Sequence, residues 1–188
     1  MEIRKIVIAG ATALLCAATF AQAPPASPKP GPEVKKLSAF VGKWTEEGDL
    51  KASPMGPAGK MAGTDNCEWT AGGFAVMCHE SQKIPGMFNS TGTSLIAYDA
   101  NAKQYTYAEA DSTGMSAISK GTVDGDTWTW TSEGMMNGQN YHQRFTMKFT
   151  SKDEFDFKFE IGTDANSMSE VMNGKEKRMT AAAKPATK

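Results

Sequence analysis

The stretch Leu37-Ser38-Ala39-Phe40-Val41-Gly42-Lys43-Trp44 decides the fold, because of what lies on either side of it. Upstream, residues 33–40 space apolar side chains at near-helical intervals, which predicts a short amphipathic helix that Gly42 ends. Downstream, about ten short segments alternate apolar and polar residues, which predicts antiparallel strands. We expect an all-β, up-and-down antiparallel barrel of about 8–10 strands with a short N-terminal helix, since closure removes the exposed edges of an open meander.

The strand prediction depends on a period of two along the chain. Residues 145–149 place Phe, Met and Phe on one face, and residues 155–161 place three Phe and an Ile on one face. Turn residues such as Gly72-Gly73 and Asp124-Gly125 separate the segments. The expected strands lie near residues 43–51, 61–71, 74–83, 91–99, 103–111, 116–123, 126–133, 139–150, 153–161 and 168–180.

The ends of the chain predict an exported protein. Residues 1–23 combine a basic start, an apolar stretch and the small-x-small sequence Ala21-Gln22-Ala23, which is typical of a cleaved signal peptide. Residues 24–32 hold five prolines and indicate an extended linker. The barrel domain is expected over 33–180 and a disordered tail over 181–188. The predicted location is periplasmic or secreted, in a bacterium.

The charge balance argues against two classes of partner. The full chain has 20 basic and 21 acidic residues. Signal removal takes away Glu2, Arg4 and Lys5, which leaves 18 basic and 20 acidic residues and a formal charge of −2. No basic excess is left to attract nucleic acid or an anionic membrane, and no other segment is long or apolar enough to anchor the mature chain in a bilayer.

Two cysteines, Cys67 and Cys78, are left after signal removal. If Gly72-Gly73 is a two-residue turn, the hairpin register sets these cysteines opposite each other and places Trp69 on the same face. Directly opposed residues have a separation that a disulfide tolerates, and export favours oxidation. A redox-active pair is the alternative, but the close Cys-x-x-Cys spacing is missing. We predict a structural disulfide, with Trp69 packed beside it.

Several of these features together resemble a known family. The features are the run 37–44, the Gly72-Gly73 hairpin, residues 92–99, residues 105–112 and the run 121–125. In this order and spacing they are similar to the calycin-like family numbered 1579 among domains of unknown function. The resemblance covers roughly residues 36–180, implies a lipocalin-like barrel in secreted bacterial proteins, and carries no assigned activity.

The resemblance also implies roles for three structural residues. In true lipocalins, the tryptophan of a Gly-x-Trp motif packs at the closed end of the barrel under an arginine from the final strand. Gly42 and Trp44 match that motif, and Arg178 is the matching arginine, with Lys177 as the reserve. The motif between the middle strands of lipocalins is not recognisable, so no ligand is carried over.

The strongest functional hypothesis is a cavity inside the barrel. A mostly apolar wall with a few polar groups is typical of small-molecule pockets. The candidate ligand-binding residues, all in phase with the aromatic stripes, are Tyr105, Tyr107, Glu109, Asp111, Trp128, Trp130, Tyr141, Gln143, Phe145, Met147 and Phe157. Alternatively, these bulky side chains fill the barrel, which then acts as a solid interaction module.

Catalysis and cofactors have little support in the sequence. Only His79 and His142 are available, and no nucleophile elbow, phosphate loop or zinc-protease motif occurs. Glu109 and Asp111 form the one candidate carboxylate pair. Haem ligation of the nitrobindin kind needs a histidine near the C-terminus, and the methionines are too scattered for copper. We predict a non-enzymatic binder of a small apolar or amphipathic molecule, with no cofactor and no metal.

Overall fold

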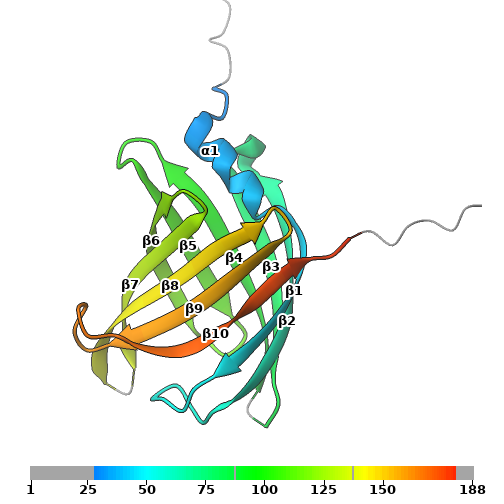
Figure 1. Ribbon diagram of the computed structural model, residues 1–188. Helices are drawn as coiled ribbons and strands as arrows, with labels where there is room; N and C mark the ends of the chain where they lie inside the picture. The colour runs from blue at the N-terminus through cyan, green and yellow to red at the C-terminus, as the bar shows by residue number, and fades with distance from the viewer. Residues whose placement is uncertain (1–27, 87, 137, 181–188) are drawn as a thin grey trace, which may run out of the picture.

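The computed structural model describes residues 28–180 except 87 and 137; the predicted signal peptide and C-terminal tail lie outside the described residues. Ten strands follow a short helical segment (Figure 1). The helical segment is α1 (Pro32–Lys36) and η1 (Leu37–Ala39), and a second short turn is η2 (Ala71–Gly73). The strands are β1 (Gly42–Leu50), β2 (Gly59–Thr70), β3 (Ala75–Ile84), β4 (Phe88–Asp99), β5 (Gln104–Asp111), β6 (Ser116–Asp124), β7 (Thr127–Met136), β8 (Gln139–Ser151), β9 (Glu154–Gly162) and β10 (Ser169–Arg178).

The strands form one closed barrel in the order β1-β10-β9-β8-β7-β6-β5-β4-β3-β2. Every strand pairs antiparallel with its neighbours in sequence, and β1 closes the barrel against β10 with Trp44 opposite Arg178. The predicted fold class is confirmed, because each expected alternating segment became a strand and each of the ten described strands pairs on both sides. The alternation is visible in β1, where Trp44, Glu46 and Gly48 face inward between exposed neighbours.

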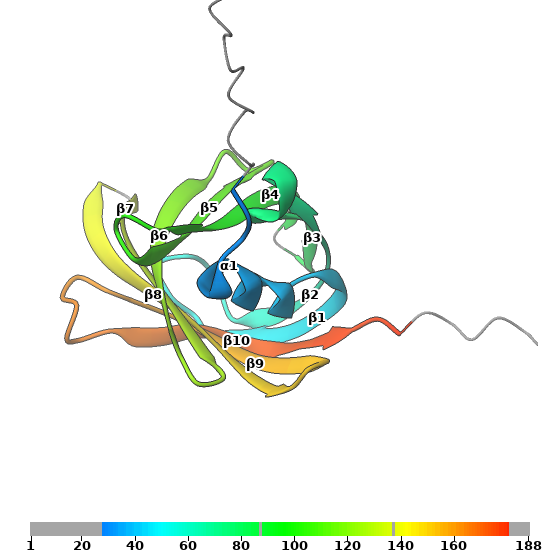
Figure 2. The same cartoon turned by 90° about the horizontal axis from the view of Figure 1, so that it is seen from above.

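The helical segment lies across one end of the barrel, as Figure 2 shows from above. Pro32 begins α1, where the missing N–H of proline is no loss, and Val34 and Leu37 turn toward the barrel and are buried. Gly42 follows with a φ of +137°, and the Arg178 guanidinium occupies the space where a Cβ would stand. We call this end of the barrel the closed end, and the opposite end the open end.

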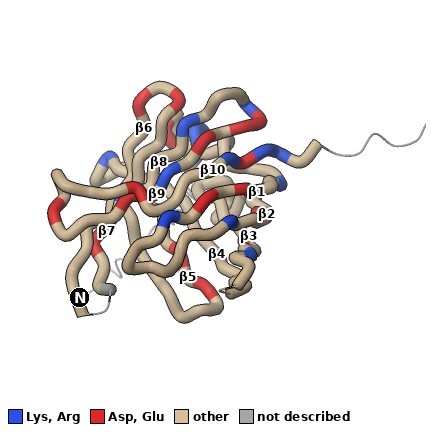
Figure 3. The backbone as a smooth tube through the Cα atoms, turned by 60° about the horizontal axis from the view of Figure 1, so that its bottom comes forward, with Lys and Arg blue, Asp and Glu red and all other residues tan. Residues whose placement is uncertain are grey.

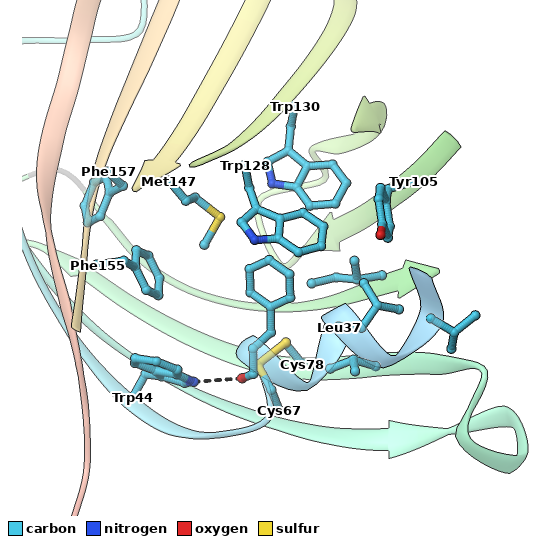
Figure 4. Packing of buried hydrophobic residues seen from close by; sticks show 14 of the residues in the cluster. Leu37, Trp44, Cys67, Cys78, Tyr105, Trp128, Trp130, Met147, Phe155 and Phe157 are labelled. Atoms are coloured by element: carbon cyan, nitrogen blue, oxygen red, sulfur yellow. Dashed lines mark hydrogen bonds between the residues drawn. A yellow bond between two sulfur atoms is a disulfide. The ribbon is translucent and has the colours of Figure 1, made fainter. Parts of the chain in front are cut away.

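Side chains fill the barrel at the closed end. Phe40 directly follows η1 and packs inside the barrel. Its ring centroid lies 4.8 Å from that of Trp128, in an edge-on arrangement, and 5.8 Å from that of Phe149. The indoles of Trp128 and Trp130 stack with centroids 5.8 Å apart (Figure 4). Trp44 is 1% exposed, and its indole N–H donates to the Phe40 carbonyl at 2.8 Å. These contacts fix the helical segment to the aromatic half of the interior.

Cys67 and Cys78 lie opposite each other on β2 and β3 and form a disulfide, as predicted. The predicted register is also observed, but the turn is longer than expected. Residues 71–73 all have positive φ, and the last pair of the ladder is Thr70 with Ala75. Trp69, on the same strand two residues beyond Cys67, is 39% exposed and is not part of the buried core. Its partner across the ladder, Val76, is fully buried, so the two sides of this hairpin differ in exposure.

The outer surface mixes charges of both signs. Acidic and basic positions alternate over the strands and loops, and no broad region of one sign is visible (Figure 3). Surface ion pairs such as Lys175 with Asp156 and Lys51 with Glu170 connect neighbouring strands or a strand and a loop. Among the described helices, none is long and apolar enough to cross a membrane.

Candidate functional site

Arg178 and Trp44 form a clamp at the closed end. The Arg178 guanidinium carbon lies 4.0 Å from the centroid of the Trp44 ring, where the family resemblance placed it. The same guanidinium donates to the carbonyls of Val41, Ala39 and Lys152, and its Nε donates to the Asp153 carboxylate at 3.1 Å. One arginine therefore ties the helical segment, the first strand and the β8–β9 turn together. The clamp closes this end of the interior.

Several predicted ligand-binding residues belong to the filled half of the barrel. Tyr105 and Trp128 are buried against each other with centroids 4.8 Å apart, and the Tyr105 hydroxyl donates to the Glu33 carboxylate at 2.8 Å. Trp130, Met147 and Phe157 are also buried. Tyr105 and Trp128 therefore pack against the helical segment, and both side chains are buried.

Toward the open end, the inward-facing side chains are only half-buried. Tyr107 and Glu109 on β5, and Tyr141, Gln143 and Phe145 on β8, are all of intermediate exposure although they are in phase with buried neighbours. The inward face of the barrel is therefore less completely buried toward the end opposite α1. Among the predicted binding residues, these are the ones whose side chains are partly exposed.

Asp111, another predicted binding residue, is held by its own turn. Its carboxylate accepts hydrogen bonds from the Thr113 hydroxyl and backbone N–H and from the Met115 N–H in the β5–β6 turn. Burial acts to raise the pKa of Asp111, but these hydrogen bonds outweigh it and lower the pKa. One carboxylate oxygen of Asp111 therefore stabilises the β5–β6 turn. The strand phase alone did not reveal this, because the hydrogen bonds arise from the turn.

A belt of carboxyl groups crosses the middle of the interior. Its members share an inward phase on five strands, and we call them the acidic belt: Glu46, Asp65, Glu80, Glu109 and Glu176. Glu46 lies directly opposite Glu176 across the β1–β10 closure, and Asp65 lies directly opposite Glu80. Glu46 and Glu176 are 5% and 7% exposed. Carboxyl groups that are buried to this extent need protons, donors or cations around them.

Neutral donors satisfy part of the acidic belt. The hydroxyls of Ser94 and Tyr107 both donate to one oxygen of Glu80, at 2.6 and 3.2 Å. The Gln82 amide donates to Glu46 at 3.3 Å. Gly63 makes room for Glu46, since a Cβ at that position would stand 2.6 Å from the carboxylate oxygen. The packing around the belt is therefore specific to these side chains.

The environment raises the pKa of every member of the acidic belt. Burial raises the pKa of Glu46 to about 8, and the charges of Asp65 and Glu80 add to the shift. Burial and the charge of Glu80 raise the pKa of Glu109 to about 7. Burial, followed by the repulsion of neighbouring carboxylates, also raises the pKa of Asp65 and Glu176. Burial likewise raises the pKa of Glu80, against the hydrogen bonds that it accepts. The belt therefore holds protons near neutral pH.

No protein cation neutralises the acidic belt within the part of the chain that the structure describes. The ion pairs there involve other carboxylates, and Arg178, two residues from Glu176, directs its donors to Asp153 and backbone carbonyls. Among the same residues, no three His, Cys, Asp or Glu side chains are grouped to hold a metal ion. His79 and His142 lie on outward positions beside Thr93 and Glu133. The arrangement offers buried acid groups and aromatic walls to a ligand.

Sequence reasoning found only Glu109 of the acidic belt. Asp65 and Glu80 could have been found from the sequence. The register that pairs Cys67 with Cys78 also pairs these two residues on the same inward face. Glu46 shares the inward phase of Trp44, and Glu176 shares that of Arg178. Their meeting depends on closure of the barrel between the first and last strands, which the local pattern does not contain.

One protein-family model matches most of the chain. The model of the family described as "Protein of unknown function (DUF1579)" matches residues 29–178. The chain belongs to this family. The resemblance inferred from the sequence motifs is therefore confirmed. No curated protein matches the sequence.

Solved structures share the fold at low sequence identity. This DUF1579 protein is similar to the crystal structure of Rv2717c from M. tuberculosis, with a TM-score of 0.57 and 12% identity over 80% of this chain and 99% of that one. It is also similar to the S-type phycobiliprotein lyase CPES from Guillardia theta, with a TM-score of 0.54 and 9% identity over 79% of this chain and 93% of that one. Both likenesses support the barrel architecture.

Proposed function

We propose that this DUF1579 protein is an exported, non-enzymatic binder of a small amphipathic molecule. The observation that carries the proposal is the asymmetry of the interior. Side chains fill the closed end under the helical segment, whereas inward-facing Tyr107, Glu109 and Gln143 near the open end are only half-buried. A barrel of this size can hold one small ligand, and a site that is closed at one end and open at the other admits it in one orientation.

The lining supports an amphipathic ligand. Phe145 is half-buried and packs on the buried Phe157 with ring centroids 5.8 Å apart, so it offers an apolar surface beside the polar groups of Tyr107 and Gln143. Proteins with a similar barrel include one named as a phycobiliprotein lyase, and that likeness supports the fold alone. The competing proposal is a barrel that acts only through its surface as an interaction module.

A paired substitution on β6 tests the binder proposal. Ala117 faces inward opposite Glu109, whereas the neighbouring Ile118 is 73% exposed on the outer surface. Ala117→Phe should fill the open end and abolish binding, while Ile118→Phe should leave binding unchanged. The assay is intrinsic tryptophan fluorescence titrated with long-chain fatty acids, quinones and terpenoids, with thermal unfolding to show that both variants fold. Absence of a saturable response across the panel would favour the interaction module.

A further inference from the structure

None of the ion pairs of the described residues involves a carboxyl group of the acidic belt. Five carboxyl groups approach one another from five strands, and the donors that reach them are the neutral groups of Ser94, Tyr107 and Gln82. Burial and the neighbouring carboxylates raise the pKa of both Asp65 and Glu176, which favours the protonated form of these groups. In the absence of a ligand, bound protons therefore neutralise the carboxyl groups that a cation could otherwise neutralise.

A second, independent feature of the same region is an unsatisfied donor on Trp130. This side chain is 2% exposed, and its indole N–H has no hydrogen-bond partner among the described residues. The six-membered ring of the indole lies over Gly121, where a Cβ would stand 2.2 Å from a ring carbon, so the N–H is on the opposite edge, away from β6. Figure 4 shows this nitrogen on the side of the ring turned away from Tyr105 and toward Met147.

Trp130 and the acidic belt are connected through Tyr107. The Tyr107 ring lies 5.5 Å from the Trp130 ring, and its hydroxyl donates to Glu80. An aromatic face next to carboxylates is the combination that recognises an organic cation, through cation–π attraction and charge-assisted hydrogen bonds. A buried N–H without an acceptor destabilises the folded protein. A ligand that supplies a hydrogen-bond acceptor would remove this penalty.

We propose that the acidic belt and Trp130 form the headgroup site for an amphipathic amine, whose ammonium group lies among the carboxylates and whose adjacent oxygen accepts the Trp130 N–H. This inference rests on the proposed function, since the apolar part of the ligand occupies the open end. The ammonium takes the place of protons that the belt holds, so binding releases protons to solvent. The raised pKa values of Glu46 and Glu109 support this exchange.

Three other charged groups lie near the belt. One carboxylate oxygen of Asp111 accepts hydrogen bonds from its own turn, Arg178 is bonded at the closed end, and His79 lies on an exposed position of β3. The charges of Asp111 and His79 still act on Glu80, so the pH dependence of amine binding is set by the belt together with these two neighbours. Affinity for an amine should rise as the pH increases from about 6 to about 8.5, because the amine stays protonated over this range while the carboxyl groups lose protons.

Calorimetric titration with four probes of equal chain length tests the proposal: 2-amino-1-decanol, decylamine, 1-decanol and decanoate. At about pH 8 the amino alcohol should bind at least about tenfold more tightly than 1-decanol, with decylamine between them and decanoate weakest. Titrations in two buffers of different ionisation enthalpy should detect proton release. Glu46→Gln and Glu176→Gln should each reduce the amine preference, whereas Glu47→Gln, an outward and exposed neighbour on β1, should not.

The outcomes separate the two proposals. Equal binding of 1-decanol and the amines, or amine affinity that falls as pH rises, would overturn the amine site and leave the binder proposal standing. Equal affinities of decylamine and the amino alcohol would overturn the role of the Trp130 N–H. Failure of all four probes to bind would overturn the amine site, and the independent panel of fatty acids, quinones and terpenoids would then decide the binder proposal.

Discussion

Replacement of Glu46 by Gln should make the protein more stable at neutral pH, although it removes a buried polar group. Glu46 is 5% exposed, and its pKa is raised from 4.5 to about 8, first by burial and then by Asp65 and Glu80. Gln has nearly the shape of a protonated Glu, and its carbonyl oxygen can still accept the hydrogen bond from Gln82. The variant therefore keeps the packing and removes the titration.

The size of the effect follows from proton linkage. Below pH 4.5 both the folded and the unfolded protein hold the proton, and Glu46 contributes no pH dependence. As the pH rises from 4.5 to 8, the unfolded chain releases the proton and the folded protein keeps it, so stability falls by about 1.4 kcal/mol per pH unit. At pH 7 the accumulated loss is about 3 kcal/mol, and Glu46→Gln should recover a gain of that order.

Urea unfolding of the wild type and the variant, with the disulfide intact, at about pH 4.5 and pH 7 measures this difference. The midpoints should agree at the lower pH and separate at the higher pH, with the variant the more stable. Glu47→Gln is the control, because it lies one residue away on the exposed face of the same strand. If Glu46→Gln is less stable than the wild type at both pH values, the carboxyl group is ionised in the folded protein and the reasoning is wrong.

Three further predictions concern the barrel itself. Arg178→Ala should lower the free energy of unfolding by about 2–4 kcal/mol, because it removes the cation–π contact and four hydrogen bonds at the closed end; an unchanged urea midpoint would refute the clamp. Denatured, unreduced mature protein should contain no free thiol, since Cys67 and Cys78 are bonded; a titration that finds two contradicts this. Gly121→Ala should displace the Trp130 ring, because the new Cβ would stand 2.2 Å from a ring carbon, and should change the near-UV circular dichroism; an unaltered spectrum would argue against the close contact.

The local elements of this protein could be predicted from its sequence. Alternating stripes such as 145–149 identify strands, because a strand with one buried face needs an apolar side chain at every second position. The hairpin of β2 and β3 fixes its own register, so the pairing of Cys67 with Cys78 followed from short-range geometry. The position of Arg178 over Trp44 followed from the family resemblance, since spacing alone does not connect residues so far apart.

Only the tertiary structure decided which inward positions are filled and which are charged. Glu46 and Glu176 are 130 positions apart, and they meet because β1 closes the barrel against β10. In a local window each is a polar residue in an alternating strand, which is the normal appearance of a solvated face. Tyr105 likewise has the pattern of a cavity residue, yet its hydroxyl is bonded to Glu33 under the helical segment. Periodicity specifies the face of a strand, whereas the space in front of that face depends on what the rest of the chain brings there.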